Sequence, residues 1–217
     1  MLSRYYCVRR FLSERAALAL LLCCALTAHA AAPRSDGKAL YGPCVVCHQP
    51  GAQGSPDGHI PSLAGQQSSY LAEQLALFHS GARADTAMQL VTAHSAFNGQ
   101  QNMLEISDYL ASLDPNSTPV KGSGEHLRVG QETYSHLCAS CHGIDGRGDA
   151  RGRVPRLAGQ HYPYLRRQIE QVASVHRKSV PRNMGVVLGN LYGDQKDAVA
   201  DYLSRLDESA ASLDLNR

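Results

Sequence analysis

The chain has 217 residues, enough for one medium-sized domain or two small ones. Hydrophobic residues make up 43%, charged residues 18%, and the formal net charge is +2, which is an ordinary composition for a soluble protein. With so small a charge, and with no basic run interleaved with aromatic residues, nucleic acid is not an expected partner.

The first 30 residues have the pattern of a secretory signal peptide. Arginines near the start are followed by an apolar run at 16–26 and then by small residues. This run is shorter than the roughly 20 residues needed to span a bilayer, which disfavours a retained membrane anchor. We therefore expect residues 1–30 to be cleaved and the mature protein to reside in the periplasm.

Four of the seven cysteines lie beyond this segment, all inside two copies of a five-residue motif. The copies read CVVCH at 44–48 and CASCH at 138–142. In an oxidising compartment paired cysteines normally become disulfides. No cysteine outside the motifs is left to build a disulfide framework, so the motifs themselves must account for these residues.

The sequence around the motifs is duplicated as well, at a shift of 93 or 94 residues. PSLAGQQSSYLAEQL at 61–75 matches PRLAGQHYPYLRRQI at 155–169 in eight of fifteen positions. DYLASL at 108–113 likewise matches DYLSRL at 201–206. Self-similarity over this much of the chain indicates a tandem duplication.

The duplication divides the chain into two domains. We place the N-terminal domain at 31–114 and the C-terminal domain at 125–217. The stretch between them, 115–124, is rich in Pro, Gly and Ser and is interpreted as a short linker.

Both domains are predicted to be helical. Apolar residues recur at helical spacing over 68–81 and again over 102–114, where Pro115 ends the pattern. A brief helix is expected before each CxxCH motif, and no segment shows the sustained alternation of a strand. The fold class is therefore all-α, with a few short helices in each domain. Domains with so little apolar core usually need an additional source of stability, which a large apolar cofactor would supply.

A CxxCH motif is the attachment signature of a c-type haem. Two residues between the cysteines bring both sulfurs to one side of a helical turn, and the next residue projects toward the metal. Two thioether bonds then hold the haem, and the adjacent imidazole becomes an axial ligand of the iron. The predicted attachment residues are Cys44, Cys47, Cys138 and Cys141, and the predicted axial ligands are His48 and His142.

Two other chemistries use CxxC pairs. A thioredoxin-like redox pair belongs to a strand–helix unit, which the sequence does not indicate. A four-thiolate zinc site usually joins neighbouring pairs, whereas these pairs lie far apart, each at the head of its own repeat. Two covalently bound haem c groups are therefore the expected cofactors.

The sixth iron ligand is predicted to be a methionine in each domain. Met88 and Met184 occupy similar places, each in a loop past the middle helix, whereas Met103 fits the apolar face of the last helix. Met184 lies two residues later than a rigid shift predicts, which implies a slightly longer loop. We expect the spare histidines at the surface or at helix ends, with His94 as the rival ligand because it follows Met88 closely.

Other matched positions suggest supporting roles. Pro61 and Pro155 each lie 13 residues past the motif histidine, and their carbonyls are candidates to accept the second imidazole N–H. Arg83 and Arg177 suit haem propionates, because a guanidinium pairs well with a carboxylate. A solvated surface charge is the alternative for both arginines.

The duplicated set of CxxCH, P-x-L-A-G-Q, Y-L-x-x-Q, an Arg-to-Met segment and a closing D-Y-L helix resembles the di-haem cytochrome c4 family. The resemblance covers essentially the whole chain after residue 30. It implies two tandem class I cytochrome c domains packed face to face, each wrapped around one His/Met-ligated haem. There are two departures: Gln49 replaces the glycine usual after the first motif, and HRKSVPRNMG is an unusual sequence around Met184.

The same resemblance implies an electron carrier of a respiratory chain and not an enzyme. Membrane respiratory complexes or other redox proteins would be the donor and the acceptor. We expect a monomer, with peripheral membrane association left open. One alternative is a di-haem subunit of a dehydrogenase complex. A di-haem peroxidase or thiosulfate-oxidising enzyme is less favoured, because it needs an open iron site.

The two halves carry opposite charge. Residues 31–120 contain three Lys/Arg against seven Asp/Glu, whereas residues 121–217 contain 14 against 11. This difference could dock the halves or steer partners to each end, although solvated surfaces are the simpler interpretation.

Overall fold

A computed structural model describes residues 36–97, 99–177 and 179–206. These residues fall within one compact unit of the chain. The predicted signal peptide at 1–30 lies outside them, as does the end of the predicted C-terminal domain beyond residue 206.

Within the described ranges the secondary structure is helical, and no strand forms apart from one isolated bridge between Asp149 and Val154. The predicted all-α class is therefore confirmed. None of the helices in these ranges is long and apolar enough to cross a membrane. The first half contains α2 (Gly37–Leu40), α3 (Val45–His48), α4 (Ser68–His79), α5 (Thr86–Thr92) and α6 (Gln100–Ala111). The second half contains α7 (Leu127–Leu137), α8 (Ala139–His142), α9 (Tyr162–Ala173), α10 (Arg182–Gly189) and α11 (Gly193–Arg205).

The sequence repeat is also a repeat of helices. The middle helices α4 and α9 are 94 residues apart at both ends, and so are the one-turn helices α3 and α8 that carry the motifs. Helix α10 begins 96 residues after α5. The two-residue difference confirms the longer connection expected before Met184.

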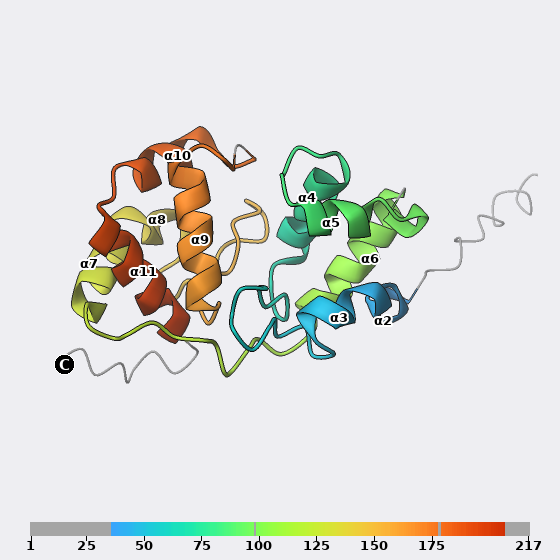
Figure 1. The fold of residues 1–217 in the computed structure, drawn as a ribbon, viewed down its shortest axis with the longest axis horizontal. Coiled ribbons are helices and arrows are strands. Elements are labelled where there is room, and N and C mark those ends of the chain that lie inside the picture. The colour runs from blue at the N-terminus through green and yellow to red at the C-terminus, as the bar shows by residue number, and fades with distance from the viewer. Residues whose placement is uncertain (1–35, 98, 178, 207–217) are drawn as a thin grey trace, which may run out of the picture. The chain divides into compact units, whose positions relative to one another are not determined.

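The helices of each half pack among themselves (Figure 1). In the first half α6 contacts α2 and α4, and α4 contacts α5; in the second half α11 contacts α7 and α9, and α9 contacts α10. Each half consequently has its own apolar core. Large members of the first core are Tyr41, Leu71, Phe97, Ile106 and Leu110. Large members of the second are Tyr134, Leu165, Val172, Val199 and Leu203.

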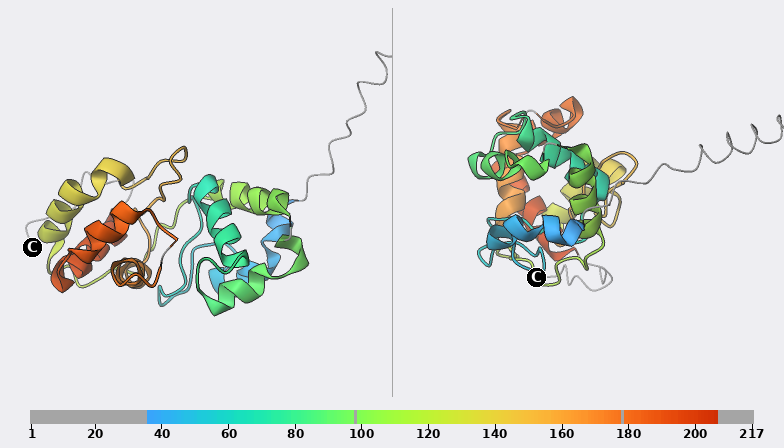
Figure 2. Two further views of the ribbon diagram at one scale, coloured as in Figure 1. Left: turned by 90° about the horizontal axis from the view of Figure 1, so that it is seen from above. Right: turned by 90° about the vertical axis from the view of Figure 1, so that its right-hand side faces the viewer.

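A glycine allows the first and last helices of each half to cross closely. A Cβ added at Gly37 would lie 2.2 Å from the Glu105 carbonyl oxygen, and one added at Gly130 would lie 2.2 Å from that of Ala198. No side chain fits such a gap, so only glycine permits the backbones to approach. In the second half this crossing brings α7 and α11 side by side, as Figure 2 shows in yellow and red.

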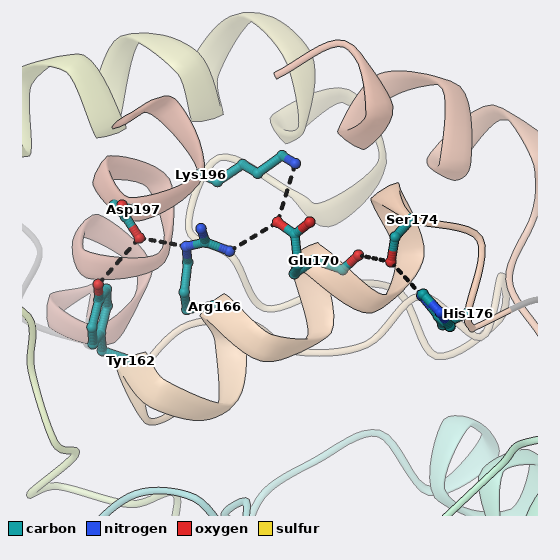
Figure 3. Close-up of polar contacts among 7 residues, drawn as sticks. All are labelled: Tyr162, Arg166, Glu170, Ser174, His176, Lys196 and Asp197. Atoms are coloured by element: carbon teal, nitrogen blue, oxygen red, sulfur yellow. Dashed lines mark hydrogen bonds and ion pairs between the residues drawn. The ribbon is translucent and has the colours of Figure 1, made fainter. Parts of the chain in front are cut away.

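Charged side chains add a second connection between α9 and α11 (Figure 3). Arg166 of α9 pairs with Asp197 of α11, and Lys196 of α11 lies 3.2 Å from Glu170 of α9. Arg166 also reaches Glu170, one turn further along α9, at 3.1 Å. Because the Glu170 carboxylate is exposed, water and salt screen these pairs, so packing dominates this contact.

Hydrogen bonds to side chains of the second half hold the segment between the halves in place. The Asp201 carboxylate of α11 accepts from the backbone N–H groups of Gly122 and Gly124, at 2.9 Å and 2.6 Å. The His161 ring accepts from the N–H of Val120 at 2.9 Å. Only 3% of His161 is exposed, so of the two expected places it takes the helix end, as the N-cap residue of α9, and not the surface.

Candidate functional site

The two motif histidines end matching one-turn helices. His48 is the last residue of α3, and His142 is the last residue of α8. Only 5% of His48 and 6% of His142 is exposed. Nδ1 of His48 lies 3.0 Å from the carbonyl oxygen of Pro61, and Nδ1 of His142 lies 3.3 Å from that of Pro155. The same contact therefore orients both rings.

These contacts leave each imidazole ready to bind a metal. A carbonyl oxygen only accepts, so Nδ1 carries the hydrogen and Nε2 presents its lone pair. Burial lowers the pKa of both His48 and His142, although the bonds to the proline carbonyls act in the opposite direction. The neutral ring, which is the form that ligates iron, therefore prevails near neutral pH.

The four motif cysteines are free thiols. Cys44 and Cys138 are partly buried, whereas Cys47 and Cys141 are exposed. Burial, helped by the neighbouring cysteine of each pair, raises the pKa of the Cys44 and Cys138 thiols to about 11. Across the described ranges, no three His, Cys, Asp or Glu side chains gather into a metal-binding group. The two pairs are thus separate sites, which suits haem attachment and not a shared zinc site.

The two candidate methionines lie on helices, so the prediction that they lie in loops is wrong. Met88 is the third residue of α5 and Met184 is the third residue of α10. The carboxylate of Asp85 accepts from the N–H of Met88 at 3.0 Å and so caps α5, which a loop assignment overlooked. The matched helical position keeps both methionines as equivalent candidates. Met103 is buried in the first core, as expected of a packing residue.

Arg83 is buried against residues of both halves. Its Nη1 donates to Oε1 of Gln74 at 2.7 Å. Its Nη2 donates to the Tyr164 hydroxyl at 3.2 Å and to Oε1 of Gln168 at 3.0 Å. Only 8% of Arg83 is exposed, so the alternative of a solvated surface charge is wrong for this residue.

Arg177 makes the mirror-image set of contacts. Its Nη1 donates to Oε1 of Gln168 at 2.6 Å. Its Nη2 donates to the Tyr70 hydroxyl at 3.0 Å and to Oε1 of Gln74 at 2.9 Å. Each guanidinium thus binds one glutamine of its own half and a Tyr–Gln pair of the other half. We call the six side chains the arginine cluster.

The arginine cluster concentrates positive charge, and Asp85 acts on Arg83 through its charge alone, without an ion pair. Among the described residues, no ion pair joins Arg83 or Arg177 to a carboxylate, and Nε of Arg177 is buried with no hydrogen-bond partner. Burial by itself would raise the pKa of Tyr164, but the two guanidinium groups outweigh it and lower that pKa. A buried cation such as Arg83, or a buried cationic N–H such as that of Arg177 Nε, calls for a compensating negative group.

Two glutamines of the P-x-L-A-G-Q motifs also join the halves, a role that the sequence did not reveal. Gln66 donates from Nε2 to the Arg156 carbonyl oxygen at 2.8 Å, and its Oε1 accepts from the Arg156 N–H at 2.7 Å. Gln160 makes the same pair of bonds to Ser62, at 2.8 Å and 3.0 Å. The sequence feature that could have indicated this role is the repetition of the glutamine at the same place in both motifs.

Comparison with known proteins assigns both halves to one family. A family model described as cytochrome c matches residues 35–114 and, separately, 128–207. A cytochrome c4 from Pseudomonas aeruginosa is 34% identical, over 70% of this chain and 78% of its own length. A thiosulfate dehydrogenase electron acceptor from Stutzerimonas stutzeri is 30% identical, over 75% of this chain and 78% of its own length.

A solved structure shares the arrangement of helices. The crystal structure of reduced recombinant cytochrome c4 from Pseudomonas stutzeri superposes with a TM-score of 0.70 at 22% sequence identity. The match covers 79% of this chain and 97% of that one. At this identity the similarity concerns the fold, and it extends over both halves.

Proposed function

This chain belongs to the di-haem cytochrome c4 family, and from that premise we propose that it carries electrons between respiratory complexes in the periplasm, with His and Met on both irons. Two covalently bound haem c groups, one in each half, follow from the two cytochrome c domains. The observation that carries the proposal is the matched pair of buried histidines, each with Nδ1 anchored on a proline carbonyl.

The residues present fit this cofactor. Cys44 with Cys47, and Cys138 with Cys141, supply two pairs of free thiols for thioether bonds. The neutral imidazoles of the next residues along the chain supply Nε2 as a ligand. When bound, a six-coordinate haem takes up and releases one electron without binding or releasing a substrate.

The arginine cluster supplies the charge that haem carboxylates need. Haem propionates are carboxylates, and a guanidinium offers them paired N–H donors. Nε of Arg177, which lacks a partner in the protein, is a donor of this kind. We assign Arg83 and Arg177 to the propionates of the two haems, where they would neutralise negative charge in a buried setting.

Met88 and Met184 would each supply a thioether sulfur to the iron of their own half. Met88 and Met184 occupy the same place on α5 and α10, so one assignment serves both halves. A thioether favours ferrous over ferric iron and keeps oxygen and peroxide away from the metal. This closure is what separates a carrier from a peroxidase.

Optical spectra of the holoprotein test this ligation. The oxidised wild type should show the weak far-red band of a sulfur-to-ferric-iron contact at the strength of two haems. Met88→Ala and Met184→Ala should each lose about half of that band and gain carbon monoxide binding. Met103→Leu, a core substitution in α6 and outside α5 and α10, is the control and should keep the whole band. A wild type with half the band, or single variants that leave it intact, would contradict the assignment.

A second candidate role differs only in the electron donor. One relative is named a thiosulfate dehydrogenase electron acceptor, so a thiosulfate dehydrogenase is a candidate donor for this chain. Stopped-flow mixing of the oxidised holoprotein with a purified thiosulfate dehydrogenase and thiosulfate would show fast haem reduction in that case. Slow reduction there, with fast reduction by a respiratory quinol–cytochrome c reductase, would favour the respiratory role. Reduction by thiosulfate alone would instead indicate an enzyme.

A further inference from the structure

A single peptide group connects the candidate axial histidine of the first half to the second half. The peptide between Pro61 and Ser62 has its carbonyl oxygen 3.0 Å from Nδ1 of His48. The N–H of the same peptide donates to Oε1 of Gln160 at 3.0 Å. A continuous chain of hydrogen bonds therefore runs from the His48 ring, through one peptide, to a side chain of the other half.

The second half repeats this chain in the opposite direction. The carbonyl oxygen between Pro155 and Arg156 lies 3.3 Å from Nδ1 of His142. The N–H of that peptide donates to Oε1 of Gln66 at 2.7 Å. Each candidate axial histidine is thus linked to the glutamine of the other half, and not to that of its own.

Local hydrogen bonds hold both glutamine amides in the orientation that this chain requires. Oε1 of Gln66 also accepts from the N–H of Gln67 at 2.9 Å, and Oε1 of Gln160 also accepts from the N–H of His161 at 2.9 Å. Nε2 of each amide faces a carbonyl oxygen of the other half. Both Oε1 atoms therefore meet N–H groups only, which defines the amide orientation. Each glutamine is only 8% exposed, so water competes little for these bonds.

We propose that Gln66 and Gln160 are positioning residues that tune the haem of the opposite half. When a peptide N–H donates a hydrogen bond, its carbonyl becomes a stronger acceptor, because hydrogen bonds in a chain polarise one another. A stronger bond at Nδ1 makes the imidazole a more basic ligand. A more basic imidazole stabilises ferric iron relative to ferrous iron, and so lowers the reduction potential of the haem. Gln160 would therefore lower the potential of the first haem, and Gln66 that of the second.

This inference rests on the proposed function, because it needs His48 and His142 as axial ligands. Wild-type spectra check that assignment before any variant is made. If the histidines are not ligands, the wild-type holoprotein fails that check. If they are ligands and the inference is wrong, the wild type passes and only the variants give the unexpected result.

The test is a crossed pair of substitutions in the holoprotein. We would measure the potential of each haem by redox titration, with NMR of the hyperfine-shifted haem methyl groups to tell the two haems apart. Gln160→Met should raise the potential of the first haem only, and Gln66→Met that of the second only. We expect about a threefold change in the one-electron equilibrium constant, roughly 30 mV.

The control is Gln67→Met. Gln67 also bonds across the halves, from Nε2 to the carbonyl oxygen of Arg147 at 2.8 Å, but not to a peptide that holds an axial histidine. Both potentials should stay at wild-type values. If Gln160→Met does not accumulate with two haems, Gln160→Asn is the second variant. Its side chain stays polar but is too short to accept from the N–H of Ser62. Equal shifts at both haems, or none in either crossed variant, would overturn the proposal.

Discussion

At the scale of single residues, the position after each CxxCH motif shows how backbone conformation selects an amino acid. Gln49 and Gly143 both end their one-turn helices with positive φ, at 67° and 80°, and ψ near the fully extended value. This region of φ and ψ is essentially restricted to glycine. A tyrosine hydroxyl binds each carbonyl: Tyr41 donates to Gln49 at 2.7 Å and Tyr134 to Gly143 at 2.5 Å. The surrounding structure thus holds Gln49 in a strained state.

Gln49→Gly should therefore stabilise the protein. Relief of the strain is worth about 1–3 kcal/mol, and the added freedom of glycine in the unfolded chain offsets about 0.5–1 kcal/mol of it. Thermal unfolding of the holoprotein followed by circular dichroism would show a higher Tm. The matched control, Gly143→Ala, introduces the same strain in the second half and should lower the Tm. A fall in Tm for Gln49→Gly would show that its side chain contributes more than the strain costs.

At the scale of helices, the crossing of the first and last helix holds each half together around its site. The crossing is tight at Gly37 and Gly130, and it brings the Tyr41 and Tyr109 rings to 5.9 Å and the Tyr134 and Tyr202 rings to 5.8 Å. The hydroxyls of Tyr41 and Tyr134 then reach past the motif helices. Helix packing in this way supports the turn that follows each histidine.

Gly130→Ala should disrupt this crossing in the second half. The added Cβ would lie 2.2 Å from a backbone oxygen of α11, so α7 must move away, at a cost of about 1–3 kcal/mol. We expect a lower Tm and a lower yield of protein with two haems. Gly193→Ala is the control, because no atom lies within 4 Å of its added Cβ. A Gly130→Ala variant as stable as the wild type would show that the helices separate easily.

At the scale of the whole molecule, contacts between the halves come in pairs. A side chain of the first half that binds the second half is matched by the equivalent side chain of the second half, which binds the first. Gln66 binds Arg156 while Gln160 binds Ser62, and these positions are related by the 94-residue shift. Such reciprocity is the mark of an isologous contact, in which the same surface is used twice. The ion pair of Glu73 with Arg153, at 3.4 Å, is exposed and is worth about 0–1 kcal/mol.

The arginine cluster makes a prediction at this scale. Arg83→Gln removes a buried positive charge and Arg177→Gln a partly buried one, so the ferric state becomes more stable relative to the ferrous state and both haem potentials should fall. We expect a change of roughly threefold or more in the one-electron equilibrium constant. Redox titration of the holoprotein measures it, with Arg153→Gln as an exposed control that should leave the potentials unchanged. Potentials that stay constant in the cluster variants, with only the Tm reduced, would mean that the arginines merely join the halves.

Much of this organisation could be predicted because its signals are local. Periodicity placed the helices, the CxxCH motifs identified haem attachment, and the spacing from His to Pro pointed to a carbonyl that lies within hydrogen-bond distance of each Nδ1. The helical start around Met88 was missed because the capping role of Asp85 was overlooked. The burial of His161 was missed because its partners, Val120 and Gln53, belong to segments distant in the sequence.

The sequence by itself determined the all-α class, the duplication and the two haem c groups, because each of these is written in local periodicity and short motifs. Only the tertiary structure decided what the repeated Gln66, Gln160, Arg83 and Arg177 contact. Their partners in the other half lie 81 to 107 residues away, and nothing in a sequence position specifies such a partner. The physical reason is that a buried amide or guanidinium must satisfy its hydrogen bonds wherever folding places it. Here folding places all four against the opposite half.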